Sequence, residues 1–274
     1  MPGVGPIQPR RPYPDFNSLL YTTSWGLSTY NSLQVKATKR YSHGVTWLNS
    51  YTWGACTDNN EGDEGYGAGV GNNGPQDYNN RGANRGPCEN DAKQRFVSSG
   101  VWQLPVGNGM HFLNSIGRLN YLVGGWEASG ILSLQSGFPL TVVSLNDWSN
   151  TGSVSPRPDR TCSGAGPRTV SQWFNPSCFS TTALQDLLQA GTPRFGNSGR
   201  GIVAGPRLAN LDFAVLKKTP ITERVSAEFR AEFFNIFNHP YFGDPNSAFG
   251  SPLFGEIGSA GTPRDIQFGL KLLF

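Results

Sequence analysis

The chain has 274 residues, a formal net charge of +3 and 15% charged residues, against roughly 25% in ordinary soluble domains. This composition excludes coiled coils and charge-rich disordered chains, and the small net charge without a basic run argues against a nucleic-acid partner. No stretch of about 20 apolar residues is present, so we expect no transmembrane helix.

Alternation of apolar and polar residues predicts seven β-strands, with a weaker eighth near residues 16–23. In the first clear strand, Leu33, Val35 and Ala37 share one face, and polar residues occupy the other. Most of the strands are close to the 9–11 residues that cross a bilayer. In chain order, the seven lie near residues 33–40, 45–53, 94–104, 126–135, 210–218, 225–233 and 266–274.

The connections between these strands differ in length in a regular way. Long ones, at about 54–91, 143–207 and 238–263, follow the second, fourth and sixth strands, and the others are shorter. In an up-and-down meander, alternate connections lie at the same end of the sheet. Transmembrane β-barrels have long extracellular loops and short periplasmic turns, so this pattern favours a barrel. One helix is predicted, at residues 182–190 in the second long connection.

The sixth strand carries a charged face that is expected to line a wet lumen. Glu228, Arg230 and Glu232 alternate with Ala227, Phe229, Ala231 and Phe233. An arginine that faced lipid at the bilayer midplane would cost about 2–4 kcal/mol. The same alternation also fits the solvated outer face of a soluble sheet, so a single strand does not decide between the two.

Two further patterns favour the membrane. Aromatic residues gather near predicted strand ends, where outer-membrane barrels carry interfacial girdles. The last strand has apolar residues at alternate positions up to a terminal phenylalanine, which is typical of the signal that outer-membrane proteins present to the barrel-assembly machinery. The predicted girdle residues are Trp47, Tyr51, Trp53, Trp102 and Trp126, and the predicted assembly signal is Ile266, Phe268, Leu270, Leu272 and Phe274.

Motifs for catalysis, cofactors or metals are weak or missing in the sequence. Residues Gly69 to Gly74 match G-x-G-x-x-G, but they lie in a glycine- and asparagine-rich stretch that runs into Pro75 rather than into a helix. The three histidines are scattered, and no pair has metal-ligand spacing. We therefore expect no catalytic residues, no cofactor, no metal and no enzymatic activity.

The four cysteines fall two in each of two long connections. They are Cys56 and Cys88, then Cys162 and Cys178, and they allow three pairings. Both connections would face an oxidising exterior, so pairing within each connection is our hypothesis.

Several segments resemble Oar-like TonB-dependent outer-membrane receptors of the type that contains a carboxypeptidase-regulatory-like domain. The resemblance is carried by AEFRAEFFNIFNHPYFGDPN at 227–246 and by PRDIQFGLKLLF at 263–274, which are similar to the C-terminal end of such receptors. Further similar segments follow the family's order and extend the resemblance over nearly the whole chain, from about residue 11. They lie at 30–53, 95–109, 124–142, 173–179 and 195–218.

The resemblance implies an outer-membrane barrel of about 22 strands, filled by an N-terminal plug and driven by the TonB complex through a short N-terminal box. No signal peptide, plug or TonB box is visible in residues 1–274, so we expect a C-terminal fragment or a truncated gene product. Its fold would be a partial antiparallel barrel of seven or eight strands, either open or curled on itself. The implied location is the outer membrane of a Gram-negative-type bacterium, and the implied ligand is a siderophore, an oligosaccharide or a peptide.

Two alternatives remain open from the sequence alone. One is a secreted, soluble β-rich binding or adhesion module, in which the apolar faces would pack into a core. The other is a small autonomous eight-stranded barrel. The direction of five apolar side chains distinguishes a soluble module from a membrane protein. They would pack inward in a soluble module and point outward, unpacked, in a membrane protein. The five are Phe229, Phe233, Phe268, Leu270 and Phe274.

Overall fold

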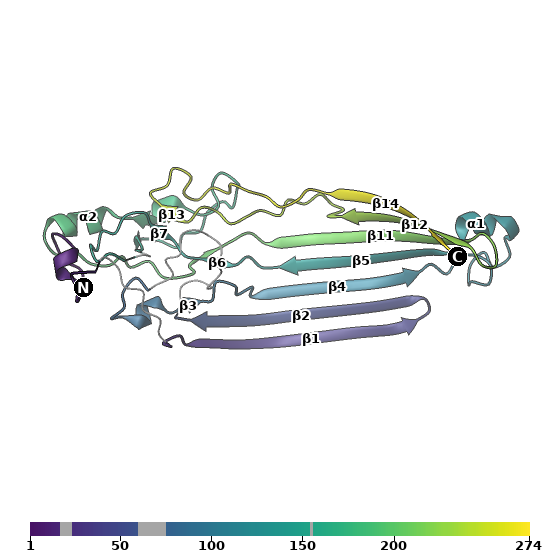
Figure 1. Cartoon of the computed structure of the whole chain (residues 1–274), viewed down its shortest axis with the longest axis horizontal. Coiled ribbons are helices and arrows are strands. Elements are labelled where there is room, and N and C mark those ends of the chain that lie inside the picture. The colour runs from purple at the N-terminus through teal and green to yellow at the C-terminus, as the bar shows by residue number, and fades with distance from the viewer. Residues whose placement is uncertain (17–23, 60–74, 154–155) are drawn as a thin grey trace.

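Seven long strands form one antiparallel sheet, in which each long strand pairs with the next one along the chain (Figure 1). The computed structural model describes residues 1–16, 24–59, 75–153 and 156–274. The seven predicted strands are confirmed, and the weaker strand expected near 16–23 lies, apart from Phe16, outside the described residues. The long strands are β1 (Ser28–Ser42), β2 (Val45–Asp58), β4 (Gln94–Gln103), β5 (Trp126–Gln135), β11 (Leu208–Pro220), β12 (Ser226–Phe234) and β14 (Asp265–Leu273).

Shorter elements lie in the connections. The predicted helix is confirmed as α2 (Thr182–Gln189), but the expectation of a single helix was wrong, because α1 (Asn120–Val123) is a second one. One helical turn is too short to give a periodic sequence signal. No helix in the described part of the chain is long and apolar enough to cross a membrane. The two-residue strands are β3 (Gly86–Pro87), β6 (Pro139–Leu140), β7 (Val143–Ser144), β8 (Asp159–Arg160), β9 (Phe179–Ser180), β10 (Val203–Ala204) and β13 (Ala248–Phe249).

Strand pairing gives the sheet one apolar face and one polar face. Residues directly opposite in neighbouring strands share a face, because side chains alternate with a period of two. Phe233 lies opposite both Phe213 and Ile266, while Glu232 lies opposite Ala214 and Gln267. The same register continues to β1, where Val35 pairs with Tyr51 and Lys36 with Ser50. The faces predicted strand by strand therefore join into two continuous surfaces, called here the apolar face and the polar face.

The two ends of the sheet differ. The short turn end holds the β1–β2 turn, the β4–β5 connection, the β11–β12 turn and the C-terminus (Figure 1). The long connections after β2, β5 and β12 all lie at the opposite end, as the alternation of lengths predicted. The last strand ends one residue earlier than expected, at Leu273, so Phe274 lies just beyond it.

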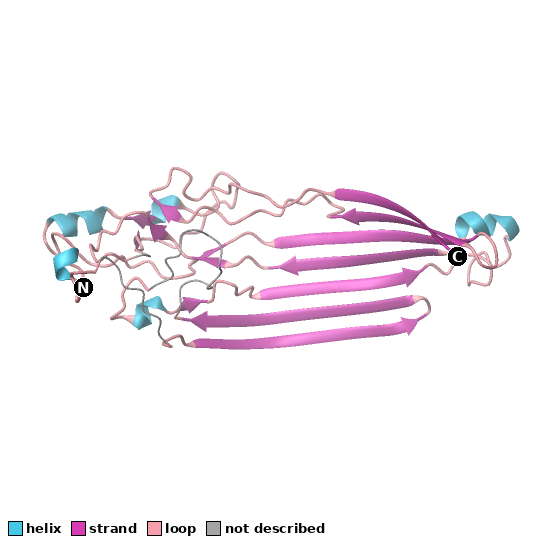
Figure 2. Cartoon of the chain, in the orientation of Figure 1, coloured by secondary structure: helices cyan, strands magenta, loops and turns pink. Residues whose placement is uncertain are grey.

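The buried core belongs to the long connections and not to the sheet. Described residues of 59–93, 136–207 and 235–264 fold together into what we call the loop cap (Figure 2). Within it, β6 pairs with β10, and β7 pairs in parallel with β13. The rings of Phe174 and Phe254 meet edge to face with centroids 5.0 Å apart. The buried core residues are Val142, Phe174, Cys178, Phe179 and Val203.

The sheet is open. Its edge strands, β1 and β14, are not paired with each other in the described structure, and both run from the loop cap toward the short turn end. Figure 2 shows β1, β2, β4, β5 and β11 side by side across the view. This confirms the expected partial barrel.

The open edges give a crosslinking prediction. A Val35→Cys, Phe268→Cys double variant, with one thiol on each edge strand, will not form an intramolecular crosslink with a short bifunctional thiol reagent. The matched control, Val35→Cys with Tyr51→Cys, will crosslink, because these residues are opposite each other in β1 and β2. The measurement is the mobility of the chain in denaturing electrophoresis after labelling in outer membranes. Efficient crosslinking of Val35→Cys to Phe268→Cys would mean that the seven strands close on themselves.

Candidate functional site

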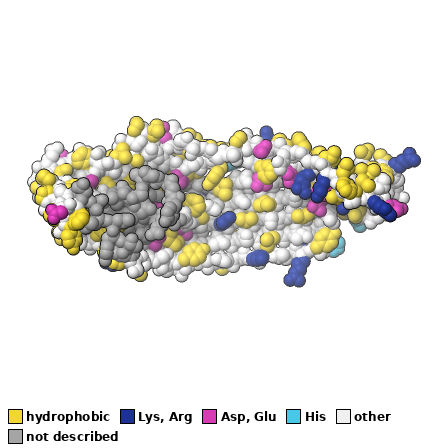
Figure 3. All heavy atoms as spheres, viewed as in Figure 1, with side chains coloured by type: hydrophobic (Ala, Val, Ile, Leu, Met, Phe, Trp, Pro, Cys, Tyr) yellow, Lys and Arg dark blue, Asp and Glu magenta, His cyan; other side chains and the backbone are white. Residues whose placement is uncertain are grey.

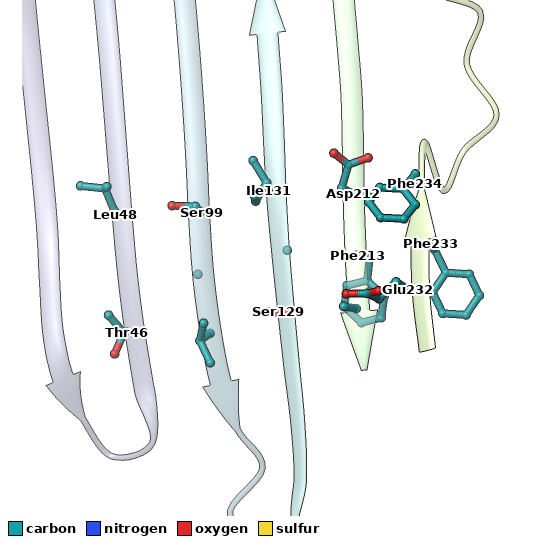
Figure 4. Close-up of a pocket in the computed structure, with 14 residues that line it drawn as sticks. Thr46, Leu48, Ser99, Ser129, Ile131, Asp212, Phe213, Glu232, Phe233 and Phe234 are labelled. Carbon is teal, nitrogen blue, oxygen red and sulfur yellow. The ribbon is translucent and has the colours of Figure 1, made fainter. Parts of the chain in front are cut away.

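The polar face forms a wall with a cavity of about 520 Å³ (Figure 4). Its volume is in the range of small-molecule sites, roughly 300–1,000 Å³. Hydroxyl groups and aliphatic side chains alternate around it, with two carboxylates on one side. Such a lining can hold a small ligand by hydrogen bonds and apolar contact. The lining residues from the polar face include Thr46, Leu48, Ser99, Val101, Ser129, Ile131, Asp212 and Glu232.

Asp212 fixes the rim of this cavity. Its Oδ1 accepts hydrogen bonds from the backbone N–H of Asn235, at 2.9 Å, and from Nδ2 of Asn210, at 3.0 Å. Asn235 is the first residue after β12. The carboxylate therefore holds the chain where it leaves the sheet for the loop cap, and it binds the two neighbouring strands together at that point.

The three charges predicted to face a lumen lie in a row on the polar face. Arg230 Nη2 is 3.4 Å from Glu228 Oε1, and Arg230 Nη1 is 3.6 Å from Glu232 Oε1. Gln267 Nε2 donates to Glu232 Oε2 at 2.6 Å. The Arg230 side chain is 48% exposed, so each pair is worth at most about 1 kcal/mol. The main effect of these three side chains is therefore to place alternating negative and positive charges on the polar face, and their contribution to the stability of β12 is small.

The apolar face leaves large side chains unpacked. Phe268 and Leu270 keep 69% and 75% of their surface, and Phe274 is fully exposed. Phe229 is also exposed and stacks on Phe268 across the strands, with centroids 6.2 Å apart. Phe233 is half-buried beside Phe213 on the same face. A soluble sandwich would bury such residues in a core, whereas a membrane protein turns them toward lipid.

The five predicted girdle residues share the apolar face. Trp102 and Trp126 lie at the short turn end, with Trp47 close to it. The expectation was wrong for Trp53 and Tyr51, because β2 continues to Asp58 and places them inside the strand, five and seven residues before its end. Trp47 Nε1 donates to Ser98 Oγ at 2.7 Å. Trp47 and Trp53 are six positions apart along β2, about 20 Å at the usual strand rise. This is close to the height of about 25 Å of the apolar band of outer-membrane barrels.

Arg200 binds separate parts of the loop cap to the end of the sheet. Its side chain is fully buried, and its Nη2 donates to the carboxylate of Asp58 and to the carbonyls of Gly86, at 3.1 Å, and Pro87, at 3.0 Å. Burial lowers the pKa of Arg200. One guanidinium thus joins the end of β2, strand β3 and the β5–β11 connection. The sequence did not indicate this contact, because Arg200 and Asp58 are 142 residues apart and Arg200 lies in a segment without periodicity.

A second ion pair orders the middle of the cap. Arg194 donates to both carboxylate oxygens of Asp159, at 2.8 and 2.6 Å, and the backbone N–H of Asn197 donates to Oδ1 at 3.0 Å. Burial by itself raises the pKa of Asp159. The hydrogen bonds from Arg194 and Asn197 outweigh it and hold the pKa of Asp159 below its ordinary value. This pair was not predicted either, since it joins two parts of one long connection that carry no periodic sequence pattern.

The structure joins Cys56 to Cys88 and Cys162 to Cys178, which is the pairing within connections that we hypothesised. The first disulfide ties the end of β2 to the connection that follows it. The second places Cys178 in the cap core. Both disulfides lie at the end of the sheet that carries the loop cap.

In the described ranges, no group of three or more His, Cys, Asp or Glu side chains is arranged to hold a metal ion. The Gly69 to Gly74 segment lies outside the described residues.

The two-faced sheet, its long loops at one end and its exposed apolar face together describe a membrane barrel wall, and comparison with known families agrees. Residues 1–267 match the family described as outer membrane beta barrel domain. The chain belongs to this family. Comparison with curated proteins finds no match.

Membership places this outer-membrane β-barrel protein in the outer membrane and indicates a transporter-like or porin-like role. It also removes the alternative of a secreted soluble module, in agreement with the exposed Phe268 and Leu270. The loop cap is then the extracellular end, since outer-membrane barrels place their long loops outside the cell.

The disulfides can be tested directly. Peptide mapping of the unreduced chain will recover peptides that link Cys56 to Cys88 and Cys162 to Cys178. Reduction before digestion is the control and will release all four peptides separately. Free thiols at all four positions, or links between the two connections, would contradict the assignment.

The Asp159–Arg194 pair predicts a pH dependence of the loop cap. A carboxyl group whose pKa is lower in the folded state stabilises the fold at pH values above its unfolded pKa, about 3.9. This stabilisation is lost as the pH falls through the folded pKa. Asp159→Asn will therefore destabilise the cap at pH 7 by about 1–3 kcal/mol and remove part of its acid sensitivity.

The measurement is protease resistance of the loop cap against denaturant concentration, at pH 7 and at pH 3. Asp186→Asn in α2, an exposed carboxylate without this pairing, is the matched control and will leave the curve unchanged. Equal behaviour of Asp159→Asn and the unmodified chain at pH 7 would show that the ion pair does not stabilise the cap.

Proposed function

We propose that residues 1–274 form the C-terminal barrel segment of an Oar-like TonB-dependent outer-membrane transporter. The transporter takes up a siderophore, an oligosaccharide or a peptide, and this segment has no enzymatic activity. The observation that carries the proposal is the open antiparallel sheet, whose two edge strands run in the same direction.

The open edges require further strands in the membrane. The bilayer core offers no water to hydrogen-bond the free N–H and C=O groups of β1 and β14, so both edges need partners. Direct pairing of β1 with β14 would be parallel, whereas bacterial outer-membrane barrels are antiparallel and even-numbered. An odd number of further strands satisfies both edges.

The shape of the sheet supports many further strands over one. In an eight-stranded barrel, seven strands would wrap almost a full circle, with the two edges a single strand apart. The strands instead lie side by side in an open sheet (Figure 1). A wide barrel of about 22 strands with a plugged lumen accommodates this shape.

The loop cap and the polar face support selective uptake over open diffusion. The extracellular connections have their own hydrophobic core, two disulfides and the buried Arg200, so they form a folded surface at the mouth of the barrel. The cavity on the polar face offers hydroxyls and carboxylates to a ligand on the barrel wall. A plug and the TonB complex would act through an N-terminal part, and the barrel-assembly machinery would recognise β14 and Phe274.

The test is energy-dependent uptake in the native cell. Deletion of the coding sequence for residues 1–274 will abolish uptake of one of three labelled probes, namely a ferric siderophore, an oligosaccharide or a short peptide. A protonophore, which removes the energy that TonB transmits, will stop the same uptake in unmodified cells. Uptake of that probe that survives the protonophore would indicate a passive porin, and unchanged uptake of all three probes would contradict the proposal.

A further inference from the structure

The β4–β5 connection, residues 104–125, is much longer than its position requires. It lies at the short turn end, where two residues join β1 to β2 and five join β11 to β12. Two antiparallel strands can be joined by two to five residues. The additional residues fold into a small unit that includes α1 and projects beyond the ends of the strands (Figure 1).

This connection exposes apolar side chains where a turn in water is ordinarily polar. Each keeps about half of its surface or more. The segment contains no Asp or Glu, and Arg118 is its one permanently charged side chain. Figure 3 shows hydrophobic side chains at this end of the molecule, beside basic ones and an acidic one. The exposed apolar residues are Met110, Phe112, Leu113, Leu119, Tyr121 and Leu122.

The exposure comes from a defined fold. Asn120 Oδ1 accepts from the backbone N–H of Asn108 at 2.8 Å, and Asn108 Oδ1 accepts from the backbone N–H of Ile116 at 3.1 Å. The backbone of Phe112 bonds to Pro105 and Gly107. The two asparagine side chains and the backbone of Phe112 are thus bonded within the connection, while the apolar side chains remain exposed.

Two contacts fix the connection to the apolar face of the sheet. Trp126 Nε1 donates to the carbonyl of Leu122 at 2.9 Å, and Lys217 Nζ donates to the carbonyl of Gly124 at 2.6 Å. Trp126 and Lys217 are opposite each other on that face, and Nζ lies 5.1 Å from the centre of the indole ring. The C-terminal part of the connection, with the exposed Leu122, is therefore held next to Trp126 at the edge of the surface that meets lipid.

We propose that residues 104–125 form an interfacial anchor that lies in the periplasmic leaflet of the outer membrane. Its apolar side chains enter the boundary between headgroups and acyl chains, as those of interfacial amphipathic segments do. Arg118 faces the lipid phosphates, and the lack of carboxylates within residues 104–125 avoids repulsion between this segment and the phosphates. The occupant of this surface is the phospholipid leaflet, and the proposal depends on the outer-membrane location of the chain and not on its transport activity.

The test uses the full chain in isolated outer membranes, with one cysteine introduced at a time and labelled with an environment-sensitive nitrobenzoxadiazole fluorophore. Leu122→Cys and Leu119→Cys probe the connection at two positions. His43→Cys, in the exposed β1–β2 turn at the same end, is the matched control. We expect blue-shifted emission at both connection sites, with quenching by lipids that carry a nitroxide near the headgroup and protection from iodide. The control will show the opposite pattern.

Two outcomes would overturn the proposal. Labels at Leu122→Cys and Leu119→Cys that iodide quenches as strongly as the control would place the connection in water. Labels shielded from both quenchers would place it against a protein surface.

A charge variant tests the phosphate contact separately. Arg118→Glu should reduce lipid quenching of the Leu122→Cys label in vesicles of phosphatidylethanolamine and phosphatidylglycerol. The effect should be smaller in vesicles of phosphatidylcholine alone. Equal quenching of the two proteins in the anionic vesicles would contradict the role of Arg118.

Discussion

The hydrogen bonding of strand backbones in a medium without water is the constraint on which this structure depends. Each of the five inner long strands pairs on both sides, and each pairs with the long strands that precede and follow it along the chain. Once the register is fixed, the side chains of seven strands fall onto two continuous faces. The same constraint makes the open edges of β1 and β14 the most informative feature of the sheet, because lipid cannot satisfy them.

The molecule stabilises its two regions by different means. The sheet is a single layer whose apolar face is covered by lipid, so it needs register and backbone bonding more than a packed interior. The loop cap stands in water and is built like a small soluble domain, with edge-to-face phenylalanines, disulfides and a buried arginine. Lipid therefore covers the apolar side chains of the sheet, whereas Phe174 and its neighbours cover one another in the core of the cap.

The two ends of the barrel wall are chemically different, and the difference gives the chain an orientation. The extracellular end carries the folded loop cap, with Arg200 at the point where the connections meet the sheet. The opposite end carries Trp102, Trp126, Lys217 and the apolar β4–β5 connection. Lys217 lies on the apolar face, but its ammonium group turns back to the carbonyl of Gly124 at the end of the strand, which keeps the charge at the interface.

The sequence by itself determined the strands, their faces and the side on which the long loops lie, because a period of two is written in consecutive residues. It also indicated α2 and a pairing of cysteines within each connection. Tertiary structure alone decided how the connections fold: the parallel pairing of β7 with β13, the Phe174–Phe254 contact, and Arg200 bound to Asp58 from 142 residues away. Irregular segments have no period to read, and their contacts join residues that become neighbours only after the sheet has brought the ends of its strands together.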